Sequence, residues 1–301
     1  MFRVLCTMLL VVVLAAAQPV EDLITVDVDL VNIYFTVCNR KGHLIADLSR
    51  ERFAIFEDGH PQVITHFSRQ TDVPLTVVLL IDTSGSVRDK MSLEKEAAAE
   101  FLYTTLQSGR DKAALVTFDS FFEVRQDYTG DPALLAMAVK RIIAGGGTRL
   151  YDALHFVIKN KLTGPDERKV IVLLTDGDDK SSVYSPQEVV DEAHRNNVSI
   201  YTVSTNAFGM KPSAAVQSDQ MLELLAVETG GEAFFPTKIG KLASSFQKIA
   251  DELRSQYSMA YRSTNQRRDG TFRQIRVETA KNHYLIRTRS GYYAPLQNAQ
   301  K

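Results

Sequence analysis

The chain has 301 residues, 45% of them hydrophobic and 24% charged, with a formal net charge of -1 at pH 7. This composition is typical of a globular protein and argues against a disordered or fibrous one, and the length allows one large domain and a smaller one. The near-zero charge provides no basic field for a phosphate backbone, which argues against unspecific nucleic-acid binding.

The first residues have the pattern of an export signal. Arg3 precedes an apolar run, and small residues follow at Ala15 and Ala17. This is typical of a cleavable secretory signal, here residues 1–17 with cleavage before Gln18. The alternative is an uncleaved membrane anchor, but the run is shorter than the roughly 20 residues of a spanning helix. We therefore expect a periplasmic or secreted protein with no stable membrane span after cleavage.

Residues 18–71 form a β-rich segment by their pattern. Apolar and polar residues alternate along it, and Asp58-Gly59 is a hairpin signal. Cys38, the one cysteine after the signal, lies in an alternating apolar run and has no internal partner. We expect it to be buried as a small hydrophobic residue.

Residues 72–256 change to apolar strands that alternate with amphipathic helices. This alternation indicates a mainly parallel sheet covered by helices on both faces. The strand segments are 74–86, 111–120, 121–129, 168–179, 198–205 and 232–236, and the helical segments are 92–106, 132–143, 150–161, 187–195, 221–230 and 241–256.

Three local patterns in the helical segments predict a buried stripe, a helix start and a capping box. Leu93, Ala97, Phe101 and Thr105 recur along the first helix as a stripe, with acidic residues in its first turn. Asp131-Pro132 is a helix start with a capping residue and a proline at the first helical position. Ser185 and Glu188 form a capping box for the fourth helix.

Residues 257–301 return to alternating β patterns, with a turn expected at Asp269-Gly270. Neither this segment nor residues 18–71 has enough strands for a stable sandwich of its own. Because chain termini often lie close together, we predict that the two segments pack into one small β-rich domain.

Three polar pieces of the α/β region carry candidate chemistry. They contain Asp82, Ser84 and Ser86 after the first strand, Thr148 after a run of glycines, and Asp176 after another strand. In open α/β sheets the ligand crevice lies outside the carboxyl ends of the strands, so we expect all three pieces on one rim. Hydroxyl and carboxylate oxygens suit a small hard cation.

Mg²⁺ prefers octahedral oxygen coordination and stays electrophilic when few charged groups bind it directly. The hydroxyls of Ser84, Ser86 and Thr148 can bind it directly, while Asp82 and Asp176 hold coordinated waters. One position would remain open for an incoming carboxylate. Gly85 and the glycines from Gly145 to Gly147 are expected to let the backbone turn beside the ion without a Cβ clash.

The order D-x-S-x-S, a distant Thr after glycines and an Asp in T-D-G resembles the von Willebrand factor A (VWFA) domain and its metal-ion-dependent adhesion site. The resemblance covers about residues 72–256 and includes the text GGTRLYDAL. EDGHPQVITHF and the ending YYAP are similar to secreted bacterial VWFA-related proteins. The resemblance implies a Rossmann-like doubly wound fold, Mg²⁺ or Mn²⁺ at the site, and partners that supply an acidic side chain. It also implies that Gly85, Gly147 and Asp152 support the loops.

The same residues allow other interpretations. The pieces could be only turns and helix caps, since Asp, Ser and Gly favour such places. Asp82 could be a phosphoryl-accepting nucleophile, but Ser84 stands where such enzymes usually carry a second acid. The glycine run lacks the Lys-Ser/Thr pair of a phosphate loop, the six histidines have no zinc spacing, and no Gly-x-Ser-x-Gly elbow occurs. We therefore expect a protein that is not an enzyme.

The segment from Thr205 to Asp219 is expected to be a long loop that borders the metal rim. Phe208, Met210 and Lys211 in it either help to select the partner or belong to a surface loop without a role. The sequence thus predicts an exported, metal-dependent module for adhesion or assembly that binds an Asp or Glu of a protein ligand. The alternatives are a scaffold with a purely stabilising metal site and a metal-dependent hydrolase.

Overall fold

A six-stranded sheet forms the centre of the larger part of the protein, in a computed structural model that describes residues 30–69, 73–163, 168–206, 212–280 and 284–297. The predicted signal at 1–17 lies outside the described residues. The strand order is β10-β9-β8-β5-β6-β7, and only the β6–β7 pair is antiparallel. The strands are β5 (Leu75–Asp82), β6 (Lys112–Phe118), β7 (Phe122–Thr129), β8 (Arg168–Thr175), β9 (Val198–Ser204) and β10 (Ala233–Phe234).

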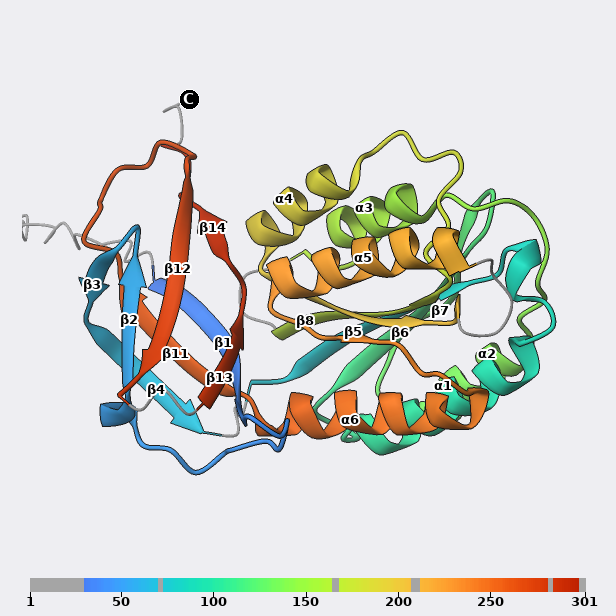
Figure 1. Cartoon of the computed structure of the whole chain (residues 1–301), viewed down its shortest axis with the longest axis horizontal. Helices are drawn as coiled ribbons and strands as arrows, with labels where there is room; N and C mark the ends of the chain where they lie inside the picture. Colours follow the sequence, from blue (N-terminus) through green and yellow to red (C-terminus); the bar gives the residue numbers. More distant parts are fainter. Residues whose placement is uncertain (1–29, 70–72, 164–167, 207–211, 281–283, 298–301) are drawn as a thin grey trace, which may run out of the picture.

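Helices cover both faces of this sheet (Figure 1). The helices on one face are α1 (Met91–Thr105), α2 (Pro132–Lys140) and α6 (Leu242–Ser255), and those on the other are α3 (Leu150–Asn160), α4 (Pro186–Asn196) and α5 (Pro212–Thr229). Because successive side chains of a strand point to opposite faces, Leu79 packs with Phe101 in the first core, whereas Leu80 packs with Leu154 in the second. The mainly parallel, doubly wound α/β fold is confirmed.

The local helix signals are confirmed with one exception. Asp131 caps α2 by accepting from the amide of Ala133 at 2.8 Å, and Ser185 and Glu188 form the capping box of α4. In α1, however, Leu93 is 42% exposed. A strict spacing of four drifts around a helix of 3.6 residues per turn, so Leu93 is carried off the buried face and Glu94 takes its place.

Helix α5 begins earlier than the sequence pattern indicated. It starts at Pro212, so the prediction of a loop as far as Asp219 is wrong. The first part of this helix is rich in Ser, Ala and Gln without a strong apolar stripe, which hid it from periodicity. Proline suits the first turn of a helix, where its missing N–H is not needed.

Two four-stranded antiparallel sheets pack against each other at one end of the folded protein (Figure 1). Their orders are β13-β1-β11-β4 and β14-β12-β2-β3, so each sheet combines strands from both ends of the sequence. The strands are β1 (Leu30–Asn39), β2 (Phe53–Glu57), β3 (His60–Gln62), β4 (Ile64–Arg69), β11 (Tyr257–Arg262), β12 (Phe272–Thr279), β13 (Tyr284–Thr288) and β14 (Gly291–Tyr293). The predicted packing of the two terminal segments is confirmed, while the exact domain bounds at 72 and 257 stay predictions.

Aromatic side chains fill the space between these two sheets. The ring centroid of Phe35 lies 5.1 Å from that of Phe53 and 5.2 Å from that of Tyr257. Cys38 is buried and unpaired, as expected. Three short 3-10 helices complete the described elements: η1 (Arg50–Arg52), η2 (Gly85–Val87) and η4 (Ile239–Lys241).

Glu252 of α6 joins the sheet that contains β1 and β13 to the α/β part. Its carboxylate accepts from the Thr36 hydroxyl of β1 at 2.9 Å and from the Tyr201 hydroxyl of β9 at 3.1 Å. Arg287 of β13 forms ion pairs with Glu252 and, at 2.8 Å, with Glu232. The parallel strands begin near this joint and end at the opposite end of the protein (Figure 1).

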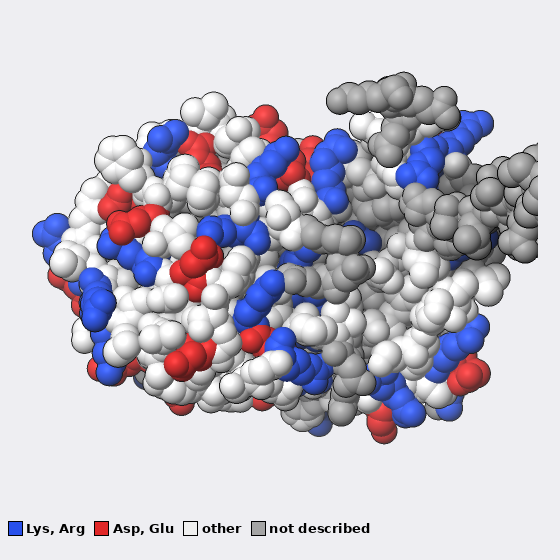
Figure 2. All heavy atoms as spheres, turned by 180° about the vertical axis from the view of Figure 1, so that it is seen from behind, with Lys and Arg blue, Asp and Glu red and all other residues white. Residues whose placement is uncertain are grey.

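The surface is mixed in charge. Figure 2 shows Lys and Arg interspersed with Asp and Glu over one face, in keeping with the net charge of -1. Among the described residues, no helix combines the length and apolar character that crossing a bilayer requires.

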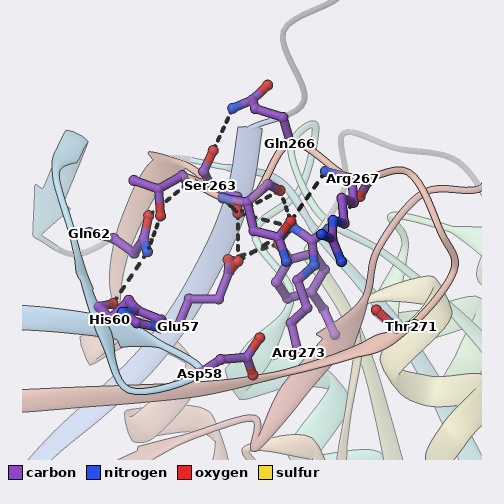
Figure 3. A network of polar contacts seen from close by, with 12 residues as sticks. Glu57, Asp58, His60, Gln62, Ser263, Gln266, Arg267, Thr271 and Arg273 are labelled. Carbon is purple, nitrogen blue, oxygen red and sulfur yellow. Dashed lines mark hydrogen bonds and ion pairs between the residues drawn. The ribbon is translucent and has the colours of Figure 1, made fainter.

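A buried ionic network holds the two β-sheets together (Figure 3). The carboxylate of Glu57 on β2 accepts from the hydroxyls of Tyr261 at 2.7 Å, Ser263 at 2.5 Å and Tyr292 at 2.9 Å. Arg273 of β12 lies 3.4 Å from the same carboxylate. Because Tyr261 belongs to the other sheet, Glu57 links the two sheets through their shared interior.

Replacing Arg273 by Met should destabilise the protein by about 3 to 5 kcal/mol, because it leaves the buried charge of Glu57 without its counterion. The matched control is Arg276→Met, which breaks an exposed pair with Glu278 and should cost less than about 1 kcal/mol. Urea unfolding of both variants measures the difference. Equal losses would contradict this role for the network.

Candidate metal centre

The carboxyl ends of β5 and β8 bring the first and third polar pieces together. In the sheet register Ile81 pairs with Leu174, so Asp82 and Asp176 follow neighbouring strands at the same edge. The Thr175 hydroxyl donates to Asp82 Oδ2 at 2.6 Å and links the two ends directly. The expectation of a shared rim therefore matches the geometry of these two pieces.

The glycine loop is bonded to both of the other pieces. The amide of Gly145 donates to the Thr83 carbonyl at 2.6 Å, and that of Gly85 donates to the Gly146 carbonyl at 3.1 Å. On its other side, the Thr148 carbonyl accepts from the amide of Lys180 at 3.3 Å. These backbone bonds tie the loop that carries Thr148 to the segments that follow β5 and β8.

The two serines of the first piece lie in contact. The amide of Ser84 donates to Asp82 Oδ1 at 2.8 Å, and the hydroxyl oxygens of Ser84 and Ser86 are 3.0 Å apart. The 3-10 turn at Gly85–Val87 brings them to this spacing. Ser84 is buried and Ser86 is exposed, so the hydroxyl pair leads from the interior to solvent.

The glycines of the rim have unequal roles. Gly146 has φ +99, and a Cβ there would lie 3.0 Å from Asp119 Cγ. A Cβ at Gly147 would lie 3.0 Å from Ser120 Oγ, which accepts from the Gly147 amide at 2.8 Å. At Gly85 a Cβ would make only an ordinary contact of 3.6 Å, so the steric reason expected for Gly85 does not hold.

Asp152 supports the loop after β8. Its Oδ1 accepts from the amides of Val183 at 2.8 Å and Tyr184 at 3.1 Å. Its Oδ2 forms an ion pair at 2.5 Å with Arg149, the residue that follows Thr148. Asp152 thus ties the loop after β8 to the start of α3.

The electrostatics of the rim suit a cation. Burial is the main cause that raises the pKa of Asp82 to about 6; the neighbouring carboxylate of Asp176 acts in the same direction, and hydrogen bonds from Thr175 and Ser84 oppose it. Asp176 is completely buried, and its Oδ2 has no hydrogen-bond partner. A bound cation would compensate both carboxylates, and the all-oxygen set of hydroxyls and carboxylates is the chemistry that Mg²⁺ or Mn²⁺ accepts. The residues present therefore fit a divalent metal.

Several residues near the rim carried no clear signal in the sequence. Glu94 belongs to the acidic first turn of α1, a pattern that favours a helix start, yet its side chain is buried. Asp119 and Ser120 support the glycine loop from the β6–β7 turn, which only the three-dimensional pairing reveals. The predicted partner-binding residues Phe208, Met210 and Lys211 lie outside the described residues.

Comparisons with known proteins agree with this fold. The family model for the von Willebrand factor type A domain matches residues 76–251. The human protein von Willebrand factor A domain-containing protein 3B is 29% identical over 165 residues, which are 53% of this chain and only 12% of that protein.

Two solved structures are similar at the level of the fold. A von Willebrand factor type A protein from Catenulispora acidiphila has a TM-score of 0.51 at 17% identity, covering 90% of this chain and 74% of that one. Proximal thread matrix protein 1 from the mussel byssus has a TM-score of 0.51 at 18% identity, covering 64% of this chain and 50% of that one.

In the presence of a chelator, the unfolding free energy should fall as the pH rises. The pKa of folded Asp82 is raised from 3.8 to about 6, so its contribution is fully present below the lower value and lost as the pH rises through the higher one. The full loss is about 3 kcal/mol, of which about 1.4 kcal/mol falls between about pH 5 and about pH 7.5. Urea unfolding at about pH 5 and about pH 7.5 measures it, and added Mg²⁺ should restore stability at the higher pH.

The control for this pH dependence is Asp82→Asn, which removes the titrating group and should make the profile shallower by the share that belongs to Asp82. Glu94, whose pKa burial raises from 4.5 to about 8, adds a slope between these two values in both proteins, so the difference between the two profiles is the quantity to compare. An identical loss in the variant over the lower range would contradict the assignment to Asp82.

Proposed function

The chain belongs to the von Willebrand factor type A family, and we propose that it is an exported, non-enzymatic module in which a divalent cation binds an acidic side chain of a protein partner. The observation that carries this proposal is a rim where hydrogen bonds hold three loops together beside a buried Asp176 oxygen that has no hydrogen-bond partner. The proposed ligands that these loops carry are Asp82, Ser84, Ser86, Thr148 and Asp176.

The proposed roles follow from charge. Ser84, Ser86 and Thr148 would bind Mg²⁺ or Mn²⁺ directly, and Asp82 and Asp176 would hold its waters. Neutral hydroxyls withdraw little of the cation's charge, so the cation keeps a strong affinity for a further carboxylate. The cation supplies that attraction when bound, while the chain supplies the oxygen set and the buried counter-charge.

Export is proposed from the signal pattern at 1–17, and the partner's Asp or Glu from the expected open position at the metal. Adhesion or assembly is the kind of process that such binding serves. Division of the chain into an α/β domain at 72–256 and a β-rich domain from 18–71 and 257–301 belongs to the same proposal.

The geometry of Asp82 weighs against the hydrolase alternative. Both of its oxygens accept hydrogen bonds, one from the Ser84 amide at 2.8 Å and the other from the Thr175 hydroxyl at 2.6 Å. Hydrogen bonds to both oxygens weaken a carboxylate as a nucleophile, while leaving lone pairs that can accept from coordinated waters. Lack of turnover of phosphoesters and peptides with Mg²⁺ supplied would exclude this alternative.

Replacing Ser84 by Ala should lower Mg²⁺ affinity at least about tenfold, because it removes a direct ligand while the fold stays intact. Isothermal titration calorimetry measures the affinity, and circular dichroism checks the fold. The matched control is Ser244→Ala, a hydroxyl deletion on exposed α6 surface. Unchanged Mg²⁺ affinity in the Ser84 variant would refute the ligand assignment.

The same variant separates binding from a purely structural metal. Partners are first captured on the immobilised protein from an envelope extract with Mg²⁺ and with chelator, and those lost with chelator are kept. If such a partner binds the folded, metal-free Ser84 variant as tightly as the unaltered protein, the scaffold alternative is correct.

Exposed apolar side chains lie on segments that adjoin the loops of the rim. Phe121, Ile143 and Val183 are 79%, 80% and 81% exposed. Phe121 lies in the β6–β7 turn that supports the glycine loop, Ile143 precedes that loop, and the Val183 amide donates to Asp152 at 2.8 Å. We propose that the partner places apolar residues beside its carboxylate.

Changing Phe121, Ile143 and Val183 together to Ser should weaken partner binding more than about tenfold, because apolar contacts around a central charge carry much of the binding energy. Mg²⁺ affinity should stay unchanged. The control changes Val63 and Leu296, which are 73% and 67% exposed at the β-sheets, to Ser. Biolayer interferometry with a captured partner measures binding, and an equal effect of both variants would argue against this surface.

A further inference from the structure

Helix α1 buries an acidic side chain that is not one of the proposed metal ligands. Glu94 is 1% exposed, and neither of its carboxylate oxygens has a hydrogen-bond partner. Buried carboxylates are ordinarily paired or hydrogen-bonded, since an uncompensated charge in the interior is costly. Glu57 in the β-sheets follows that rule and Glu94 does not.

The position of Glu94 relates it to the metal rim. Lys90 precedes it by four residues, so the two side chains lie on the same side of the helix. The Lys90 ammonium donates to the Thr205 carbonyl at 2.8 Å, and the Thr205 amide donates to the Thr175 carbonyl at 2.9 Å. Thr175 is the residue that bonds Asp82.

The charges of the rim and of Lys90 act on the Glu94 carboxylate. Its carboxylate is repelled by Asp82 and Asp176 and attracted by Lys90. All four of these side chains are buried. Three carboxylates and one ammonium leave a net charge of minus two when ionised, which one divalent cation would balance.

Glu94 is not close enough to act as one of three carboxylate ligands. No three His, Cys, Asp or Glu side chains within the part of the chain that the structure describes are grouped so that they could hold a metal. The effect of Glu94 on a cation must therefore pass through space or through coordinated water. In a buried, weakly polarisable region such an effect is strong at short range.

We propose that Glu94 is a positioning residue that sets the cation affinity of the rim, with Lys90 as the opposing charge. This inference rests on the proposed metal site. Glu94 supplies a negative charge behind Asp82 and Asp176. This charge strengthens the binding of the divalent ion and orients the water molecules that the ion holds. Lys90 limits the affinity and ties α1 to the end of β9.

The test is Mg²⁺ titration by calorimetry of the full chain at about pH 8.5, where the Glu94 carboxyl is largely ionised. Glu94→Gln should weaken Mg²⁺ binding by about 10 to 100 fold, as for other groups behind a metal's direct ligands. Lys90→Met should strengthen it severalfold. Opposite changes in affinity are the signature of charge, because structural damage would weaken binding in both variants.

The matched control is Asp111→Asn. Asp111 is also buried, accepts from the Leu75 amide at 3.0 Å, and lies at the opposite end of β5. The Asp111→Asn substitution should lower the melting temperature without changing Mg²⁺ affinity more than about twofold, since charges beyond a Debye length interact weakly.

Each outcome has one meaning. A folded Glu94→Gln variant with unchanged Mg²⁺ affinity overturns the proposal, while the metal site itself stands. Failure of the unaltered protein to bind Mg²⁺ overturns the proposed function instead. If Glu94→Gln does not fold, the Lys90→Met variant decides, and unchanged or weaker binding in it refutes the role of charge.

Discussion

The desolvated carboxylate of Asp82, at the end of a strand buried along its whole length, is the constraint on which the site depends. The β5 strand is apolar and enclosed on both faces, so the residue that ends it is buried with it. A buried charge needs compensation. The Thr175 hydroxyl and the Ser84 amide supply part of it, and these two donors draw the neighbouring strand end and the turn after β5 around Asp82.

The buried carboxylates of Glu57, Asp176 and Glu94 differ in whether the protein itself supplies their hydrogen-bond partners. Glu57 receives three hydroxyl donors and a guanidinium, so the β-sheets satisfy it internally. Asp176 keeps an oxygen without a partner, and Glu94 keeps two. The same physical requirement therefore gives a structural network at one end of the protein and a candidate ligand site at the other.

Much of the architecture could be predicted from the sequence because it is encoded locally. The apolar run that becomes β5, the Asp131 and Ser185 caps, and the alternation of the terminal segments depend on neighbours a few residues away. The rim could also be inferred, since parallel strands end at one edge. Even the joining of residues 18–71 with 257–301 followed from counting strands, because neither segment could form a stable sandwich alone.

What only the tertiary structure decided depends on residues far apart in the sequence. The pairing that places β1 between β11 and β13, the support of Gly147 by Ser120, and the burial of Glu94 behind Asp82 are set by packing across the fold. In the sequence Glu94 is one acid in a first helical turn, like many exposed ones. Its environment is made by β5, β8 and β9, so local pattern determined the elements and the donor set, and packing determined which charges lie uncompensated.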